Sequence, residues 1–165
     1  MNGLTKTKPM AIRTYNIPLM MDKTTETHWL NTLSALKRAF NRAVELIASQ
    51  NVTLSIVPVH NACYDKLRTE FPELPSQMAI RTQKEAMAML KSRKSNKHNG
   101  ELPKKHSMSI TLDKRLYSNL SPQGISLSGG EKGKRTHVPF AIFPKANEMF
   151  RNFFTKDRIE KTNKN

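Results

Sequence analysis

The sequence predicts an α+β fold in which a small β-barrel or sheet is interrupted by an inserted bundle of three to four helices. Between residues 29 and 91, apolar residues recur at the spacing of amphipathic helices. Residues 91–105 are then rich in cations and turn-forming residues. Beyond them, apolar and polar residues alternate as in half-buried strands.

Charge is the most informative property of the composition. The chain of 165 residues carries 28 Lys and Arg against 13 Asp and Glu, a formal net charge of +15, and only 37% of its residues are hydrophobic. This length fits one domain, or two small ones sharing a modest core. Because the excess charge is spread along the chain, we expect an anionic partner, above all nucleic acid. A soluble basic protein without a dedicated partner is the alternative.

Other classes of protein lack support in the sequence. No apolar run approaches the roughly 20 residues that span a bilayer, and the lysines near the N-terminus precede no apolar signal segment. The single Cys63 cannot form an internal disulfide or a zinc finger, and the five histidines are scattered. We therefore expect a cytoplasmic protein with no cofactor, no structural metal and no membrane contact.

The first half of the chain predicts a strand followed by a long helix. Residues 10–19 alternate as in a strand that Pro18 places at a sheet edge. A long helix follows, which begins after a candidate N-cap at Asp22, Thr24 or Thr25 and contains the amphipathic stretch 29–49. Its apolar stripe consists of Leu33, Leu36, Phe40, Ala43, Val44 and Ile47. Off that stripe are Lys37, Arg38, Asn41 and Arg42, which either contact a polyanion or form an ordinary solvated face.

Two further helices are predicted. Pro58 opens one that buries Val59, Cys63, Leu67 and Phe71 and ends at Pro72. Cys63 is expected to be a buried hydrophobe, because no acidic residue is evident that could orient His60 as its base.

The third helix is predicted over residues 77–91, with Pro75 and Ser76 as start signals. Backbone N–H groups at such a start attract phosphate, and the Gln77 amide can present itself to a base edge. The alternative is an ordinary cap followed by a surface glutamine. We add Arg81 and Lys84 on the same helix to the candidate nucleic-acid contacts.

A flexible basic loop is predicted over residues 91–105, with turn signals at Asn99-Gly100 and Pro103. Such a loop binds phosphates by releasing counterions, without reading sequence. A solvated linker is the alternative. The candidate contacts here are Lys91, Arg93, Lys94, Lys97, Lys104 and Lys105.

The second half predicts strands and a hairpin. Met108, Ile110 and Leu112 alternate with polar residues as in a half-buried strand. Residues 125–128 form another strand, which Gly129-Gly130 turns towards a returning edge strand over residues 136–143 that contains Pro139. A short helix over residues 147–154 closes the pattern. Candidate contacts in this half are Lys114, Arg115 and the hairpin-tip residues Lys132, Lys134 and Arg135.

These features together resemble the N-terminal half of the OrfB/TnpB insertion-sequence proteins, which are RNA-guided nucleases related to the type V CRISPR effectors. The resemblance covers most of the chain, from Met10 to the region of Phe150. It rests on Phe40-Asn41, LPSQMA at residues 74–79, KSRKSN at 91–96, DKRLYS at 113–118 and ISLSGGEKGKRTHVPF at 125–140.

The resemblance implies a wedge-like β domain over residues 1–22 and 104–165. It also implies an inserted recognition-like helical domain over residues 23–103, with the basic loop 91–105. In the family these domains hold the guide RNA and read a short transposon-adjacent motif in duplex DNA. By resemblance, the helix that begins at Ser76 and Gln77 lies near that motif. Lys114, Arg115, Lys134 and Arg135 would lie on nucleic-acid backbones.

The family's nuclease half has no counterpart here. Two-metal cleavage needs carboxylates that converge on one site, and Asp157 and Glu160 lie in the frayed C-terminal tail. We therefore expect no catalytic residue and no enzymatic activity of the chain alone. A TnpB-like fragment, which could work with a separate RuvC-containing chain, is the first interpretation. A stand-alone RNA- or DNA-binding regulator of prokaryotic or phage origin is the second, and a nuclease with an unrecognised centre is the third.

Overall fold

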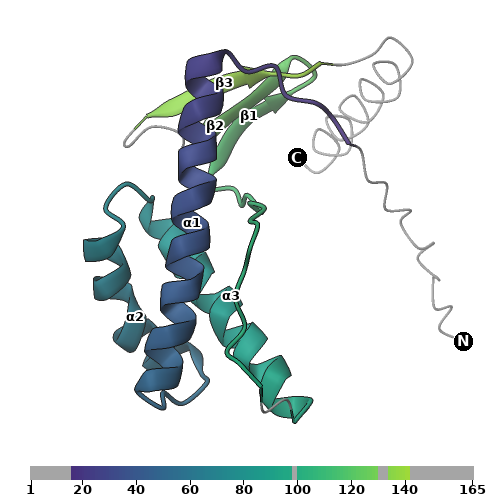
Figure 1. The fold of residues 1–165 in the computed structure, drawn as a ribbon. Helices are drawn as coiled ribbons and strands as arrows, with labels where there is room; N and C mark the ends of the chain where they lie inside the picture. The colour runs from purple at the N-terminus through teal and green to yellow at the C-terminus, as the bar shows by residue number, and fades with distance from the viewer. Residues whose placement is uncertain (1–15, 98–99, 130–133, 142–165) are drawn as a thin grey trace, which may run out of the picture.

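The computed structural model describes residues 16–97, 100–129 and 134–141. Within these ranges three helices precede a three-stranded antiparallel sheet, so the α+β class is confirmed. Figure 1 shows the sheet beside the N-terminal end of the long first helix, α1. Helices α2 and α3 pack along the rest of α1 and against each other. Helices α1 and α3 end at the same end of this bundle, far from the sheet (Figure 1).

Helix α1 spans Lys23–Ser49 and supplies most of the core. Its N-cap is Asp22, whose Oδ1 accepts the backbone N–H of Thr25 at 2.8 Å. This contact lowers the pKa of the Asp22 carboxyl, since the N–H stabilises the carboxylate. The predicted apolar stripe is buried, except that Leu33 is only half-buried. Trp29 and Ala35 join it in the core.

Helix α2 spans Ile56–Glu70 and begins two residues before the predicted start at Pro58. A proline is harmless in this first turn, because the first N–H groups of a helix have no intrahelical acceptor. The predicted stripe Val59, Cys63, Leu67 and Phe71 is buried, as expected. Burial also raises the pKa of the Cys63 thiol, which disfavours the thiolate.

Helix α3 spans Ser76–Ser95 and is longer than predicted. The prediction of a loop after residue 91 was wrong for Arg93 and Lys94, which lie in the last turn of the helix, whereas Lys91 is helical, as the predicted helix over 77–91 has it. Lysine and arginine are good helix formers, and their charge is favourable near the negative end of the helix dipole. The basic residues therefore continue the helix instead of ending it.

The sheet is open and does not close into the barrel that was one of the two predicted forms. Its strands are β1 (Tyr117–Ser121), β2 (Gly124–Ser128) and β3 (Arg135–Pro139), paired in the order β1-β2-β3. Strand β2 and the edge position of Pro139 agree with the prediction, while β3 covers only the first part of the returning strand predicted over 136–143, of which residues 142 and 143 lie outside the described ranges. Strand β1 was not predicted, because its sequence YSNLS is polar and Asn119 has a left-handed φ of 50°.

Two other strands were predicted, over residues 108–112 and 10–19, and the described part of the structure does not show either of them as a full strand. Residues 108–112 alternate in burial as expected, with Met108, Ile110 and Leu112 half-buried against the core. However, they form no strand, because no described segment pairs with them. Of the predicted N-terminal strand, only residues 16–19 lie in the described ranges. There Leu19 bridges to Phe140, and the neighbouring Met20 N–H donates to the carbonyl of Pro139, beside the edge strand.

One hydrophobic core runs through helices and sheet. Leu116, Leu127 and Val138 from the sheet region belong to the same buried cluster as Phe40 of α1. The predicted division into wedge-like and recognition-like domains stays a prediction. The hairpin-tip residue Lys132, residues 10–15 of the first strand and the helix over residues 147–154 lie outside the described ranges.

Gly129 joins the sheet to the helices. Its carbonyl accepts the hydroxyl of Thr32, and its φ of +134° is one that side-chain-bearing residues rarely adopt. An added Cβ would lie 2.4 Å from Cε of Met78.

We expect Gly129→Ala to lower the free energy of unfolding by roughly 1–3 kcal/mol, because an alanine strains the backbone at this φ and the end of the buried Met78 side chain must move. Urea denaturation followed by circular dichroism measures this. Gly100→Ala is the matched control, since no described atom lies within 4 Å of its Cβ position. Equal effects of the two substitutions would contradict the role assigned to Gly129.

Candidate nucleic-acid interface

The predicted basic residues of α1 are mostly engaged within the chain. The Arg42 guanidinium bonds both oxygens of Glu70 at 3.0 and 2.9 Å and lies 3.6 Å from Glu45. Arg38 pairs with Glu73 at 3.6 Å and lies over the ring of Phe71. Lys37 is half-buried. This face of α1 therefore presents much less uncompensated charge than its sequence indicates.

Lys105 fastens the segment after α3 to the bundle. Its ammonium is 2.8 Å from Glu85 and 4.3 Å from the ring centre of Phe40. Its backbone N–H donates to Asn41 Oδ1 at 2.9 Å, and its carbonyl accepts from Asn41 Nδ2 at 3.3 Å. These contacts give Lys105 a structural role. Lys104 beside it is exposed, in a shallow pocket that also contains Glu45 and Glu101.

A second group of predicted residues meets where α3 begins beside the sheet. We name Gln77, Arg81, Asp113, Arg115 and Arg135 the junction cluster. Asp113 Oδ2 accepts from Gln77 Nε2 at 2.8 Å and lies 3.7 Å from Arg81, while its Oδ1 accepts the backbone N–H of Arg115 at 2.9 Å. Arg135 donates to the carbonyl of Arg115 at 3.0 Å.

Asp113 organises this cluster, and it was not among the predicted site residues. The one signal for it in the sequence is the spacing to Arg115, since an aspartate often accepts the N–H two residues ahead. The N–H of Arg115, then the Gln77 amide, lower the pKa of the Asp113 carboxyl. The cluster contains three arginines and this one carboxylate, so it retains net positive charge.

We expect Asp113 to make the protein less stable in acid. Because its pKa is lower in the folded chain, its contribution is complete above the unfolded value of about 3.9 and is lost as the pH falls through the folded value. Asp113→Asn should therefore flatten the fall of the free energy of unfolding between about pH 5 and pH 2. Part of this fall should remain in the variant, since the pKa of Asp22 is lowered too. Urea denaturation at a series of pH values measures the slope.

The control is Asp65→Asn, which alters an exposed carboxylate on α2 that forms no ion pair or side-chain hydrogen bond with any described residue. If the free energy of unfolding of Asp113→Asn falls with decreasing pH as steeply as that of the unaltered protein, Asp113 does not contribute to the loss of stability in acid.

Gln77 is engaged at both ends of its amide. Besides donating to Asp113, it accepts from the Arg115 guanidinium at 3.0 Å. To read a base edge, as the sequence suggested, Gln77 would have to release both partners.

We therefore expect Gln77→Ala to weaken nucleic-acid binding equally on all sequences, because it loosens Arg115. A base-reading glutamine would instead relax the preference for one motif by about 1–3 kcal/mol. Affinity measured on a randomised set of DNA duplexes distinguishes the two results, and motif-specific loss would restore the base-reading role.

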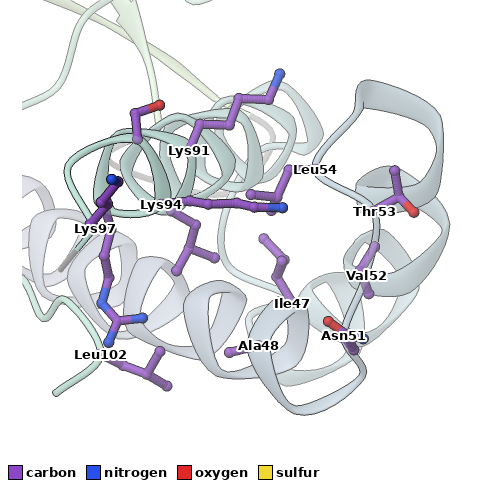
Figure 2. Close-up of a pocket in the computed structure, with 13 residues that line it drawn as sticks. Ile47, Ala48, Asn51, Val52, Thr53, Leu54, Lys91, Lys94, Lys97 and Leu102 are labelled. Carbon is purple, nitrogen blue, oxygen red and sulfur yellow. The ribbon is translucent and has the colours of Figure 1, made fainter. Parts of the chain in front are cut away.

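A third group of predicted residues lies at the opposite end of the bundle. Residues at the C-terminal ends of α1 and α3 line an open pocket of about 1190 Å³, which we name the basic pocket. Its cations are Lys91, Arg93, Lys94 and Lys97, and its apolar residues are Ile47, Ala48, Val52, Leu54, Leu90 and Leu102. Figure 2 shows Lys91 and Lys94 extending from α3 on the side of Thr53 and Leu54, with Ile47 of α1 facing the same space.

The basic pocket differs from the other two groups in its charge. Among the described residues, no Asp or Glu lines it, and Lys91, Lys94 and Lys97 form no ion pair there. Within the described part of the chain, the Arg93 guanidinium donates to the backbone carbonyl of Gly100 and to no carboxylate. All three lysines are exposed. Uncompensated cations are thus concentrated at this end of the bundle.

The remaining predicted residues are dispersed. Ser76 and Lys84 are exposed at the start and in the middle of α3, and Lys114 and Lys134 are exposed beside the junction cluster. In the part of the chain that the structure describes, no group of three or more His, Cys, Asp or Glu residues is placed to hold a metal ion. No helix within these ranges has the length and hydrophobicity needed to cross a membrane.

Comparison with protein-family models, curated proteins and solved structures finds no match to this chain.

Proposed function

We propose that this protein binds nucleic acid through the phosphate backbone, with the basic pocket as the principal contact and the junction cluster as a second one. The observation that carries the proposal is the set of exposed lysines in the basic pocket, which no described carboxylate neutralises. Each such lysine can displace a condensed counterion from a phosphate, which is the main source of sequence-independent affinity.

Stabilisation of the α3 dipole is the simplest competing reason for these cations. It accounts for Arg93 and Lys94 in the last turn, but a helix end carries only about half a negative charge. Four cations at one helix end exceed what the dipole can use. The formal net charge of +15 for the whole chain supports a polyanionic partner in the same way.

At a finer level, we propose that the chain acts as the N-terminal, wedge-plus-recognition part of a TnpB-like RNA-guided nuclease. RNA is then the first partner and duplex DNA the second, and a separate RuvC-containing chain would perform cleavage. The succession of helices, basic segment and antiparallel strands supports this proposal. A stand-alone regulator that occupies sites on RNA or DNA is the alternative, and the same lysines would serve it.

Binding at low ionic strength is the first test. The purified chain should shift both RNA and duplex DNA in an electrophoretic assay, with an affinity that falls steeply as salt is added. Sequencing of the RNA that copurifies separates the two finer proposals, because a guide-binding protein should retain one defined RNA. Failure to bind either polymer would overturn the proposed function. Metal-dependent nicking by the purified chain would overturn the proposal that it does not cut.

A further inference from the structure

We infer that the basic pocket receives an unpaired nucleotide of a single-stranded polynucleotide, with the phosphate on the lysines and the base on the apolar residues. This inference rests on the proposed function and adds the class of nucleic acid.

The apolar side of the pocket is the first reason. Ile47 and Leu90 are buried, Val52, Leu54 and Leu102 are half-buried, and all five line the same space. A duplex presents no free base face that could pack against these residues, because its bases are stacked inside and its phosphates face outward. An unpaired nucleotide offers both a phosphate and an exposed base face. The volume of about 1190 Å³ is ample for a base, since ligand pockets usually measure about 300–1,000 Å³.

Polar groups around the pocket suit the edges of a base. Asn51, Thr53 and Ser95 line it and supply an amide and two hydroxyls that can donate or accept hydrogen bonds. Such adaptable groups allow several bases to bind, as expected of a site that selects unpaired strands without reading one sequence.

The backbone at Lys97 is the second reason. Lys97 follows the C-cap of α3 with a left-handed φ of 52°, a position where glycine is the usual residue. Asn51 takes the same conformation after α1, with φ of 47°. These are two of the three non-glycine residues with positive φ in the described ranges, and both line this pocket. A lysine at a position that glycine would occupy without strain is the basis for assigning its side chain a role at this site.

The balance of charge favours an anion. The ends of α1 and α3 at the pocket contribute roughly half a negative charge each. Lys91, Arg93, Lys94 and Lys97 supply four full positive charges, so a substantial positive excess remains. An acidic amphipathic protein segment would meet the same charge and the same apolar residues, and it is therefore tested as a competitor.

The principal experiment is a thermodynamic cycle on the full chain. Fluorescence anisotropy at low salt measures binding of a single-stranded oligouridylate of about ten nucleotides, its oligodeoxythymidylate counterpart, an abasic strand of equal length and a matched duplex. Leu54→Ala should weaken binding of the base-bearing strands severalfold and leave the abasic strand unchanged, whereas Lys94→Gln should weaken both. Val57→Ala is the apolar control, because Val57 is 66% exposed and does not line the pocket. Thermal melts check that each variant is folded.

Lys97→Gly provides an independent test of the strained backbone. Glycine relieves the left-handed strain, so the melting temperature should rise even after allowing for glycine's greater freedom in the unfolded chain. Affinity for the oligouridylate should fall at the same time, and Lys97→Arg should retain it. A variant that is more stable and binds equally well would remove Lys97 from the site.

The outcomes separate this inference from the proposed function. If no polynucleotide binds, both fail. If the abasic strand and the duplex bind as tightly as the base-bearing strands, and Leu54→Ala changes none of them, nucleic-acid binding stands and the unpaired-nucleotide site is overturned. Displacement of the duplex by an oligoglutamate peptide, but not by oligouridylate, would assign the pocket to an acidic protein instead. Binding of the oligouridylate but not of the oligodeoxythymidylate would restrict the site to RNA.

Discussion

Phe40→Ala should lower the free energy of unfolding by about 3–5 kcal/mol, the usual cost of removing a fully buried phenyl ring. Phe40 has no exposed surface and lies in the hydrophobic cluster that all three helices and the sheet share. A domain of ordinary stability has only about 5–15 kcal/mol in total, so the variant should be close to unfolding at 37 °C. Urea denaturation followed by circular dichroism gives the value.

The free energy lost in Phe40→Ala has a second component, the contact of the ring with a lysine. Lys105 lies 4.3 Å from the centre of the Phe40 ring and holds the segment after α3 against the bundle. Removing the ring therefore also loosens that segment. Leu30→Ala is the matched control on α1, because Leu30 is 58% exposed and its truncation should change the free energy by less than about 0.5 kcal/mol. Comparable values for the two variants would contradict the orientation of α1.

Helix positions could be predicted from the sequence because apolar periodicity determines which face is buried. The stripes on α1 and α2 followed from spacing alone, and Asp22 was among the three proposed caps. The end of α3 could not be predicted, since KSRKS at residues 91–95 fits a basic loop and a helix end equally well. Residues 108–112 show the limit of alternation: it predicts burial, but a strand also needs a partner.

The candidate site was predictable in composition but not in arrangement. The sequence identified the basic residues, yet it could not show that Glu70 and Glu73 engage Arg42 and Arg38 from a different part of the chain. Those ion pairs depend on how α1 and α2 pack. Conversely, only the fold brings the ends of α1 and α3 together, and so unites lysines of one helix with apolar residues of the other. A prediction based on local charge could not distinguish neutralised cations from free ones.

Lys91→Gln combined with Lys94→Gln should weaken binding to all sequences of RNA and DNA, and the slope of log affinity against log salt should fall by about one unit for each phosphate that the variant no longer neutralises. Both lysines are exposed in the basic pocket without a carboxylate partner in the described ranges, so their charge is available to phosphate. Electrophoretic shifts over a series of salt concentrations provide the slope.

The matched control is Lys23→Gln combined with Lys66→Gln, which removes the same net charge from exposed positions outside the pocket. If affinity depended only on overall charge, the two double variants would show equal decreases in affinity and in slope. A contact in the basic pocket predicts instead that the control retains nearly the full slope, because a distant exposed charge is screened beyond about 10 Å at 0.1 M salt. Equal decreases in the two variants would therefore reduce the basic pocket to a part of the general positive surface.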